Sequence, residues 1–205
     1  MELEFQKILE KSRDLSFDKG IRKASMDDIA NVIGISKKTL FKYIKNKTDL
    51  VQKVLDFERD SFGKIFDEYN FEGVNAIDIL LTVSREISRR FKYVNPMVTY
   101  ELRKYYPAIY RLHFEKRIDF IFEKIKINIE KGISQGIYRS DFSIELLARL
   151  YISRLIDLQN PVFFPPDKFS FGVLFEVMFD NFIRGIANTQ GMAYYEERRK
   201  DMVFK

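Results

Sequence analysis

The sequence predicts an all-α protein in which a small three-helix module precedes a larger helical domain. Apolar residues recur at three- and four-residue spacing along nearly the whole chain, as they do on one face of an α-helix. Alternating apolar and polar runs bounded by turn residues, which indicate strands, are scarce. The chain has 205 residues, which is long enough for both parts to bury a core.

Turn and cap residues divide the chain into its helices. Gly20 and Gly34 supply left-handed residues that end helices, whereas Ser25 and Ser36 are expected to cap the starts of others. Residues 160–168 hold three of the five prolines, so we expect a loop there. The expected helices cover residues 3–17, 25–34, 36–43, 47–66, 77–95, 96–105, 107–134, 143–158 and 170–189, with a polar tail after the last.

The composition disfavours several classes of protein. There is no cysteine and only one histidine, so we expect no disulfide, no transition-metal site and no cofactor. No nucleophile–base constellation or Gly-rich phosphate loop is present, which argues against an enzyme. The N-terminus mixes charged and apolar residues unlike a secretion signal, and no apolar run is long enough to span a membrane. We therefore expect a soluble, cytoplasmic protein.

Residues 25–47 have the pattern of a helix-turn-helix. Ala30 is small enough for two helices to cross closely, and Gly34 supplies the left-handed residue of the turn. The net charge of the chain is +5, and the positive charge is concentrated in this motif. Five lysines and no acidic residue lie between Ile35 and Thr48. A lysine run alone is usually a solvated surface, but this one lies on the outer side of a helix shaped to enter the major groove.

Residues 5–55 resemble the DNA-binding head of the TetR family of bacterial regulators. The run that carries the resemblance is Ile29-Ala30, Gly34-Ile35-Ser36 and Thr39-Leu40-Phe41, followed by a lysine at the start of the next helix. Phe41 stands where the family usually has tyrosine, so we expect Tyr43 to supply the missing phosphate contact. The resemblance implies a head over residues 1–50 and a ligand-binding and dimerisation domain over 51–205.

The residues expected to contact DNA lie at the helix starts and along the second helix of the motif. The hydroxyl groups are expected to donate to phosphates, and Lys47 places a charge at the backbone. Lys37 and Lys38 are expected to contact base edges, and Lys42 a base or a phosphate. The full set is Ser25, Ser36, Lys37, Lys38, Thr39, Lys42, Tyr43 and Lys47.

The resemblance also implies that the last two long helices pair with those of a second copy in a four-helix bundle. The residues expected at this interface are Leu147, Tyr151, Arg154, Phe175, Phe179, Phe182 and Ile186. Apolar residues surround so much of helix 170–189 that one buried face does not account for them. Burial of the whole helix within its own subunit is the alternative reading.

A ligand cavity among residues 75–135 is implied by the resemblance as well. The candidate lining residues are Ser84, Ser88, Phe91, Tyr100, Tyr110, His113 and Phe122. Tyrosines suit a mostly apolar pocket with a few polar groups, but they suit an ordinary core equally well. The expected function is thus a dimeric repressor that a small molecule releases from a palindromic operator. A helical protein-interaction adaptor without ligand control is the alternative.

Overall fold

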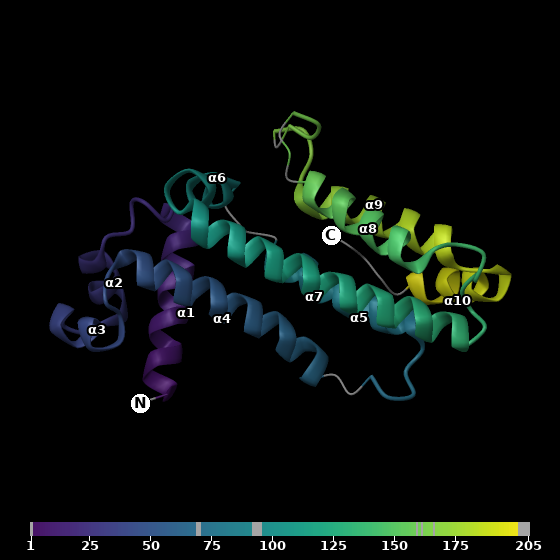
Figure 1. Ribbon diagram of the computed structural model, residues 1–205, viewed down its shortest axis with the longest axis horizontal. Coiled ribbons are helices and arrows are strands. Elements are labelled where there is room, and N and C mark those ends of the chain that lie inside the picture. Colours follow the sequence, from purple (N-terminus) through teal and green to yellow (C-terminus); the bar gives the residue numbers. More distant parts are fainter. Residues whose placement is uncertain are drawn as a thin grey trace. The chain divides into compact units, whose positions relative to one another are not determined.

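The computed structural model describes residues 2–68, 71–91, 96–158, 160, 162–165 and 167–200. Within these residues the chain is helical apart from turns, loops and one isolated bridge between Tyr138 and Ala187. The helices, shown in Figure 1, are α1 (Glu2–Lys19), α2 (Met26–Ile33), α3 (Lys37–Tyr43), α4 (Lys47–Glu68), α5 (Ala76–Phe91), α6 (Pro96–Tyr105), α7 (Pro107–Ser134), α8 (Ile144–Asp157), α9 (Phe171–Ile186) and α10 (Thr189–Arg199). The all-α prediction is confirmed.

The prediction of a polar tail after the last long helix is wrong, because α10 occupies that stretch. Asn188 caps this helix by accepting a hydrogen bond from the Gly191 amide at 3.0 Å. The Tyr195 ring is buried, and its hydroxyl donates to Asp180 of α9. Two polar groups and one aromatic ring therefore fix a segment whose composition alone indicates solvent exposure.

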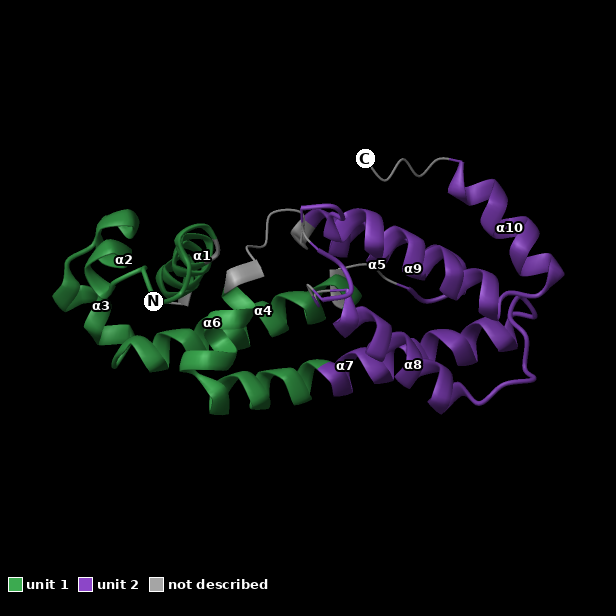
Figure 2. Ribbon diagram, turned by 90° about the horizontal axis from the view of Figure 1, so that it is seen from above, with its two compact units in different colours: residues 1–68, 93–117 green, residues 69–92, 118–205 purple. Residues whose placement is uncertain are grey.

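The chain forms two compact units, coloured separately in Figure 2. Unit 1 comprises Met1–Glu68 and Tyr93–Arg117, and unit 2 comprises Tyr69–Lys92 and Ile118–Lys205. Each unit is thus built from two stretches of chain, and α7 contributes to both. This division differs from the simple boundary at residue 50 that the sequence predicts, because α6 and the start of α7 belong with the N-terminal helices.

Unit 1 has a core that joins α1, α2, α3 and α4. Its central side chains are fully or almost fully buried, and each of the four helices contributes at least one: Ile8, Ile29, Leu40 and Leu50. A second cluster joins the α1–α2 turn and α4 to α6 through Ile21, Val51, Leu55, Val98 and Leu102. Burial of such aliphatic side chains contributes about 1.5–3 kcal/mol each, so both clusters hold the short helices in place.

The core of unit 2 is a continuous apolar cluster contributed by α5, α7, α8, α9 and α10. One face of α9 lies wholly within it, with Phe175, Ile183 and Ile186 completely buried. At the end of α7, Gly132 permits the ring of Tyr138 to pack against the helix backbone, where a β-carbon would lie 2.0 Å from that ring. None of the helices described above has both the length and the apolar character needed to cross a bilayer.

Candidate DNA-binding surface

Helix α2 begins with a complete capping box. The Asp28 amide donates to Ser25 Oγ at 3.1 Å, and the Ser25 amide donates to Asp28 Oδ2 at 2.9 Å. Hydrogen bonds from Ser25 lower the pKa of Asp28 below its ordinary value. Such reciprocal bonds satisfy two amides that a helix start otherwise leaves open. Both the amide and the hydroxyl of Ser25 therefore take part in capping α2, although the residue is exposed.

The turn between α2 and α3 has the geometry that the sequence predicts. Gly34 has a φ of 80°, in the left-handed region, and its amide donates to Ala30 O at 3.0 Å. Ser36 then caps α3 by accepting from the Thr39 amide at 3.0 Å, and the two hydroxyls lie 2.8 Å apart. Leu40 is fully buried on the inner side of α3. The opposite side of the helix is consequently left to face outward.

The outward side of α3 is basic. Lys38 and Lys42 are exposed there and form no ion pair with any residue that the structure describes. Lys37 is also exposed, but its Nζ lies 2.9 Å from Asp27 Oδ1 of α2. Phe41, at the position where the family usually has tyrosine, is exposed beside them. Two unpaired ammonium groups and one weakly paired one therefore define the charge of this helix face.

Tyr43 and Lys47 both have intramolecular partners that the sequence does not reveal. The Tyr43 hydroxyl donates to Glu4 Oε2 at 2.6 Å, and this hydrogen bond raises the pKa of Tyr43. Its ring stacks on Phe5 at a centroid distance of 5.9 Å. Lys47 is half-buried and donates from Nζ to the Ala24 carbonyl. Burial lowers the pKa of Lys47, against the opposing effect of the Asp28 and Glu101 carboxylates.

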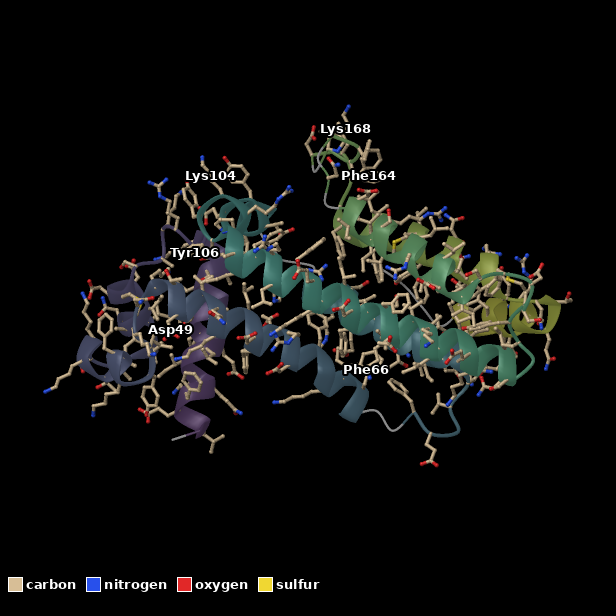
Figure 3. The ribbon with its side chains drawn as sticks, viewed as in Figure 1. Asp49, Phe66, Lys104, Tyr106, Phe164 and Lys168 are labelled. Atoms are coloured by element: carbon tan, nitrogen blue, oxygen red, sulfur yellow. The ribbon has the colours of Figure 1, made fainter. Side chains whose placement is uncertain are left out.

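The start of α4 is tied to the end of α3 by a set of short polar contacts. Asp49, labelled in Figure 3, accepts hydrogen bonds from the Lys45 amide at 2.8 Å and from Lys53 Nζ at 3.0 Å. Lys53 Nζ also donates to the Tyr43 carbonyl at 2.8 Å. Asn46 Oδ1 accepts from the Asp49 amide. These contacts fix the end of α3 against the start of α4, so the direction of α3 is defined.

The candidate ligand residues are divided between the two units. In unit 1, Tyr100 is 52% exposed with its hydroxyl bonded to Lys104 Nζ, and Tyr110 stacks on Phe114. His113 Nδ1 is buried without a hydrogen-bond partner among the described residues. Burial, with the Arg117 and Arg59 charges, lowers the pKa of His113 to about 4, so its imidazole is neutral.

In unit 2, two serines of α5 are the distinctive candidates. Ser84 Oγ and Ser88 Oγ are buried, four residues apart on one helix face, and neither has a hydrogen-bond partner in the described part of the chain. A buried hydroxyl without a partner is uncommon. Phe122 is half-buried, with the Arg149 guanidinium 5.1 Å from its ring centre. Phe91 ends α5, and its side chain lies outside the described residues.

The residues predicted for a dimer interface are mostly buried inside unit 2 itself. Phe175, Phe179, Phe182 and Ile186 lie in its core, and Tyr151 packs on Phe182 at a centroid distance of 4.5 Å. The apolar surround of α9 therefore arises largely from packing within the subunit. The large apolar side chains that α8 and α9 do expose are Leu146, Leu150, Ile156, Val173 and Val177. Leu147 is half-buried and Arg154 is exposed beside them.

The described residues contain no group of three or more histidine and acidic side chains arranged to hold a metal ion. Sequence spacing gives no signal for the Glu4–Tyr43, Lys47–Ala24 or Lys37–Asp27 contacts, because each joins different helices or turns.

Comparison with known proteins identifies the N-terminal helices. The family model "Bacterial regulatory proteins, tetR family" matches residues 8–54. An HTH-type transcriptional regulator of Staphylococcus aureus is 27% identical over an alignment of 153 residues that covers 68% of this chain and 82% of that protein. The HTH-type transcriptional repressor KstR2 of Rhodococcus jostii is 26% identical over 147 residues, covering 69% of this chain and 71% of that one.

The fold is also found among solved structures. A transcriptional regulator from Saccharomonospora viridis, crystallised in complex with choline, superposes with a TM-score of 0.68 at 20% identity. The superposition covers 92% of this chain and 100% of that one. The likeness therefore extends through both units and is not confined to the helix-turn-helix.

Proposed function

The chain is a TetR-family DNA-binding transcriptional regulator, and from that premise we propose that it is a dimeric repressor released from a palindromic operator by a small-molecule ligand. The observation that carries the DNA-binding part is the geometry of α3. Its inner side is locked by the buried Leu40, and its outer side presents Lys38 and Lys42, which form no ion pair with a described residue. A short basic helix held in this way fits the major groove.

A dimer is supported by the outward face of α8 and α9. Leu146, Leu150, Val173 and Val177 are each between 55% and 63% exposed. A groove on the same helices is lined by Leu147, Leu150, Tyr151, Arg154, Met178 and Phe182. Several exposed aliphatic side chains on two adjacent helices favour contact with an identical face, because clustered apolar surface marks interaction sites. Two recognition helices related by a two-fold axis would then read a palindrome.

A ligand is supported by the Ser84 and Ser88 hydroxyls, which have no partner among the described residues, and by the choline bound to the Saccharomonospora viridis relative. Two hydroxyls on an otherwise apolar helix face suit a ligand that is mainly apolar and carries a hydrogen-bonding group. The ligand acts only if it binds the DNA-free arrangement more tightly than the DNA-bound one.

Binding of the purified protein to the DNA upstream of its own gene tests the main proposal. We expect a specific shifted complex in a gel assay and a footprint with two-fold symmetry. Sedimentation in parallel is expected to show a dimer for the wild type and a monomer for Leu150→Glu. Leu112→Glu is the matched control, because Leu112 is also an exposed leucine but lies on α7 in unit 1. A wild-type monomer at micromolar concentration would rule out the dimer.

The ligand is tested separately by a thermal-shift screen of small molecules, with choline as the first probe. Compounds that raise the melting temperature are expected to release the operator as well. Their effect should be lost in the Ser84→Ala/Ser88→Ala variant while its operator binding remains. Release of the operator with equal potency from that variant would show that the two hydroxyls do not bind the ligand.

A further inference from the structure

A carboxylate from outside the helix-turn-helix is buried against it. Glu101 lies on α6, beyond the residues 8–54 that carry the family match, and is only 8% exposed. Burial of a carboxylate is unfavourable unless hydrogen bonds replace its lost hydration. Glu101 Oε2 accepts such a bond from the Arg22 amide, at 3.0 Å, across 79 residues of sequence. Arg22 belongs to the turn that joins α1 to α2.

The α1–α2 turn is shaped to receive this carboxylate. Gly20 opens the turn with a φ of 89°, a conformation that favours glycine. A β-carbon at Gly20 would lie 3.1 Å from Glu101 Oε2, which is tighter than ordinary contact. The absence of a side chain at Gly20 therefore permits both the backbone conformation and the close approach of the carboxylate.

Helix α6 is docked on the same turn by apolar and aromatic contacts. Val98 and Leu102 of α6 pack in one cluster with Ile21 of the turn and with α4. The Arg22 guanidinium donates to the Tyr105 hydroxyl at 3.0 Å and lies 5.1 Å from the centre of that ring. Figure 3 labels Lys104 on the outer side of this short helix. The turn is thus held on α6 through both its main chain and its side chains.

The α1–α2 turn positions part of the proposed DNA-binding surface. Its last residue, Ala24, accepts the hydrogen bond from Lys47 Nζ, and the next residue, Ser25, caps α2. The Glu101 charge also favours the ammonium form of Lys47 against the effect of burial on its pKa. A displacement of the turn would therefore move the start of α2 and the lysine at the start of α4 together.

We propose that Glu101 is a positioning residue for DNA binding, because its carboxylate holds the α1–α2 turn by accepting the Arg22 amide hydrogen. Without that acceptor the turn samples other conformations, and only a fraction of molecules present α2 and Lys47 correctly. Apparent affinity falls in proportion to that fraction. The inference rests on the proposed operator binding.

The sign of the effect separates positioning from simple electrostatics. DNA is a polyanion, so removal of a negative charge near the interface by itself strengthens binding. Positioning predicts the reverse. We expect Glu101→Ala to weaken operator binding about tenfold, the loss that corresponds to one net hydrogen bond. Its dependence on salt should stay that of the wild type, because Glu101 contacts no phosphate in this proposal.

Two further variants make the test independent of folding. Glu101→Gln keeps the full-length acceptor without the charge, and is expected to bind within about threefold of wild type. Glu101→Asp keeps the charge on a shorter arm that cannot reach the Arg22 amide, and is expected to bind as weakly as the alanine variant. If Glu101→Ala is unfolded by circular dichroism, the Gln–Asp pair decides. Glu115→Ala is the matched control, because Glu115 is an exposed acid of α7 in the same unit.

Affinities are measured by fluorescence anisotropy on the footprinted operator, and amide hydrogen exchange is followed over residues 20–25. Faster exchange in the turn together with weaker binding for the Ala and Asp variants, but not for the Gln and Glu115 variants, is the expected result. Operator binding by Glu101→Ala that equals or exceeds wild type would overturn the proposal, as would a Gln variant as weak as the alanine variant. Failure of the wild type to bind any operator would instead count against the proposed function.

Discussion

Lys37 Nζ on α3 and Asp27 Oδ1 on α2 lie 2.9 Å apart, so an acid of α2 pairs with a lysine of α3. Both side chains are more than half exposed. Exposed ion pairs of this kind contribute about 0–1 kcal/mol. The pair is therefore weak enough for a DNA phosphate or base to replace Asp27, but strong enough to hold Lys37 away from DNA part of the time.

Asp27→Ala is expected to strengthen DNA binding about two- to fivefold, because it frees Lys37 and removes a negative charge from the surface. The gain should be larger at low salt, where exposed charges are screened least. Anisotropy titrations at several salt concentrations measure it. The same substitution in a Lys37→Ala background should give a smaller gain, and an equal gain there would mean that the ion pair does not restrain Lys37.

Lys38→Ala is expected to reduce the discrimination between operator variants. Lys38 is exposed near the start of α3 without an ion pair to a described residue, where a recognition helix meets base edges. Loss of one base contact costs about 1–3 kcal/mol on the preferred operator and less on variants changed at that base pair. Competition between single-base operator variants provides the measurement. Uniform weakening on every sequence would assign Lys38 to the phosphate backbone instead.

The operator affinity of the wild type should fall steeply with salt. Four or five phosphate contacts in each subunit of a dimer give a slope of about −7 to −9 for the logarithm of affinity against the logarithm of salt concentration. A lysine that neutralises a phosphate releases a counter-ion from the DNA. This holds both for an unpaired lysine and for one that first leaves a weak partner such as Asp27. A slope near zero would contradict the assignment of α3 to DNA.

Gly132→Ala is expected to destabilise unit 2. The new β-carbon would lie 2.0 Å from the buried Tyr138 ring, whose hydroxyl donates to Asn128 Oδ1 at 3.3 Å. Overpacking of this kind costs about 1–3 kcal/mol of unfolding free energy. Gly63→Ala on α4 is the matched control, because nothing lies within 4 Å of its new β-carbon, and a gain of about 0.5–1 kcal/mol is expected. Urea denaturation compares the two, and a stable Gly132→Ala would mean that Tyr138 repacks freely.

Stability should fall on acidification partly through His113. Its pKa is about 4 in the folded chain against an ordinary value of 6.5. Between these values the unfolded chain binds a proton that the folded chain does not, so the free energy of unfolding decreases as the pH falls from about 6.5 to about 4. Burial is the main cause of the lowered pKa; the Arg117 and Arg59 charges lower it further, and the Asp56 carboxylate raises it.

His113→Gln should flatten that part of the profile. Urea midpoints of the two proteins across this range measure the difference, in which the contributions of the carboxylates common to both cancel. Identical profiles for wild type and variant would show that His113 is solvated in the folded chain.

Local physical rules were sufficient for the helix-turn-helix. Ser25, Gly34 and Ser36 act through neighbours within five residues, so their caps and turn could be predicted from sequence. Glu101 could not, because nothing in the residues around it indicates a bond to Arg22. The partners of Tyr43 and Lys47 escaped prediction for the same reason.

Tertiary packing of the C-terminal helices could not be predicted from composition or periodicity. The composition of residues 189–199 is polar, yet Tyr195 anchors them as α10. The apolar surround of α9 left two readings open, burial against a partner subunit and burial within the chain, and Phe175 and Phe179 are buried by the chain's own helices. Periodicity reports which side chains need burial and does not report what buries them.

Unit 1 combines residues 1–68 with residues 93–117. The unit that contains the helix-turn-helix therefore includes residues far beyond the motif itself. During synthesis the helix-turn-helix leaves the ribosome roughly 50 residues before α6 does, at a rate of about 5–20 residues per second. For those seconds the nascent head lacks the helix that covers its first turn. A chimera cut directly after α4 would keep that unfinished state permanently, so heads exchanged between relatives should carry α6 with them.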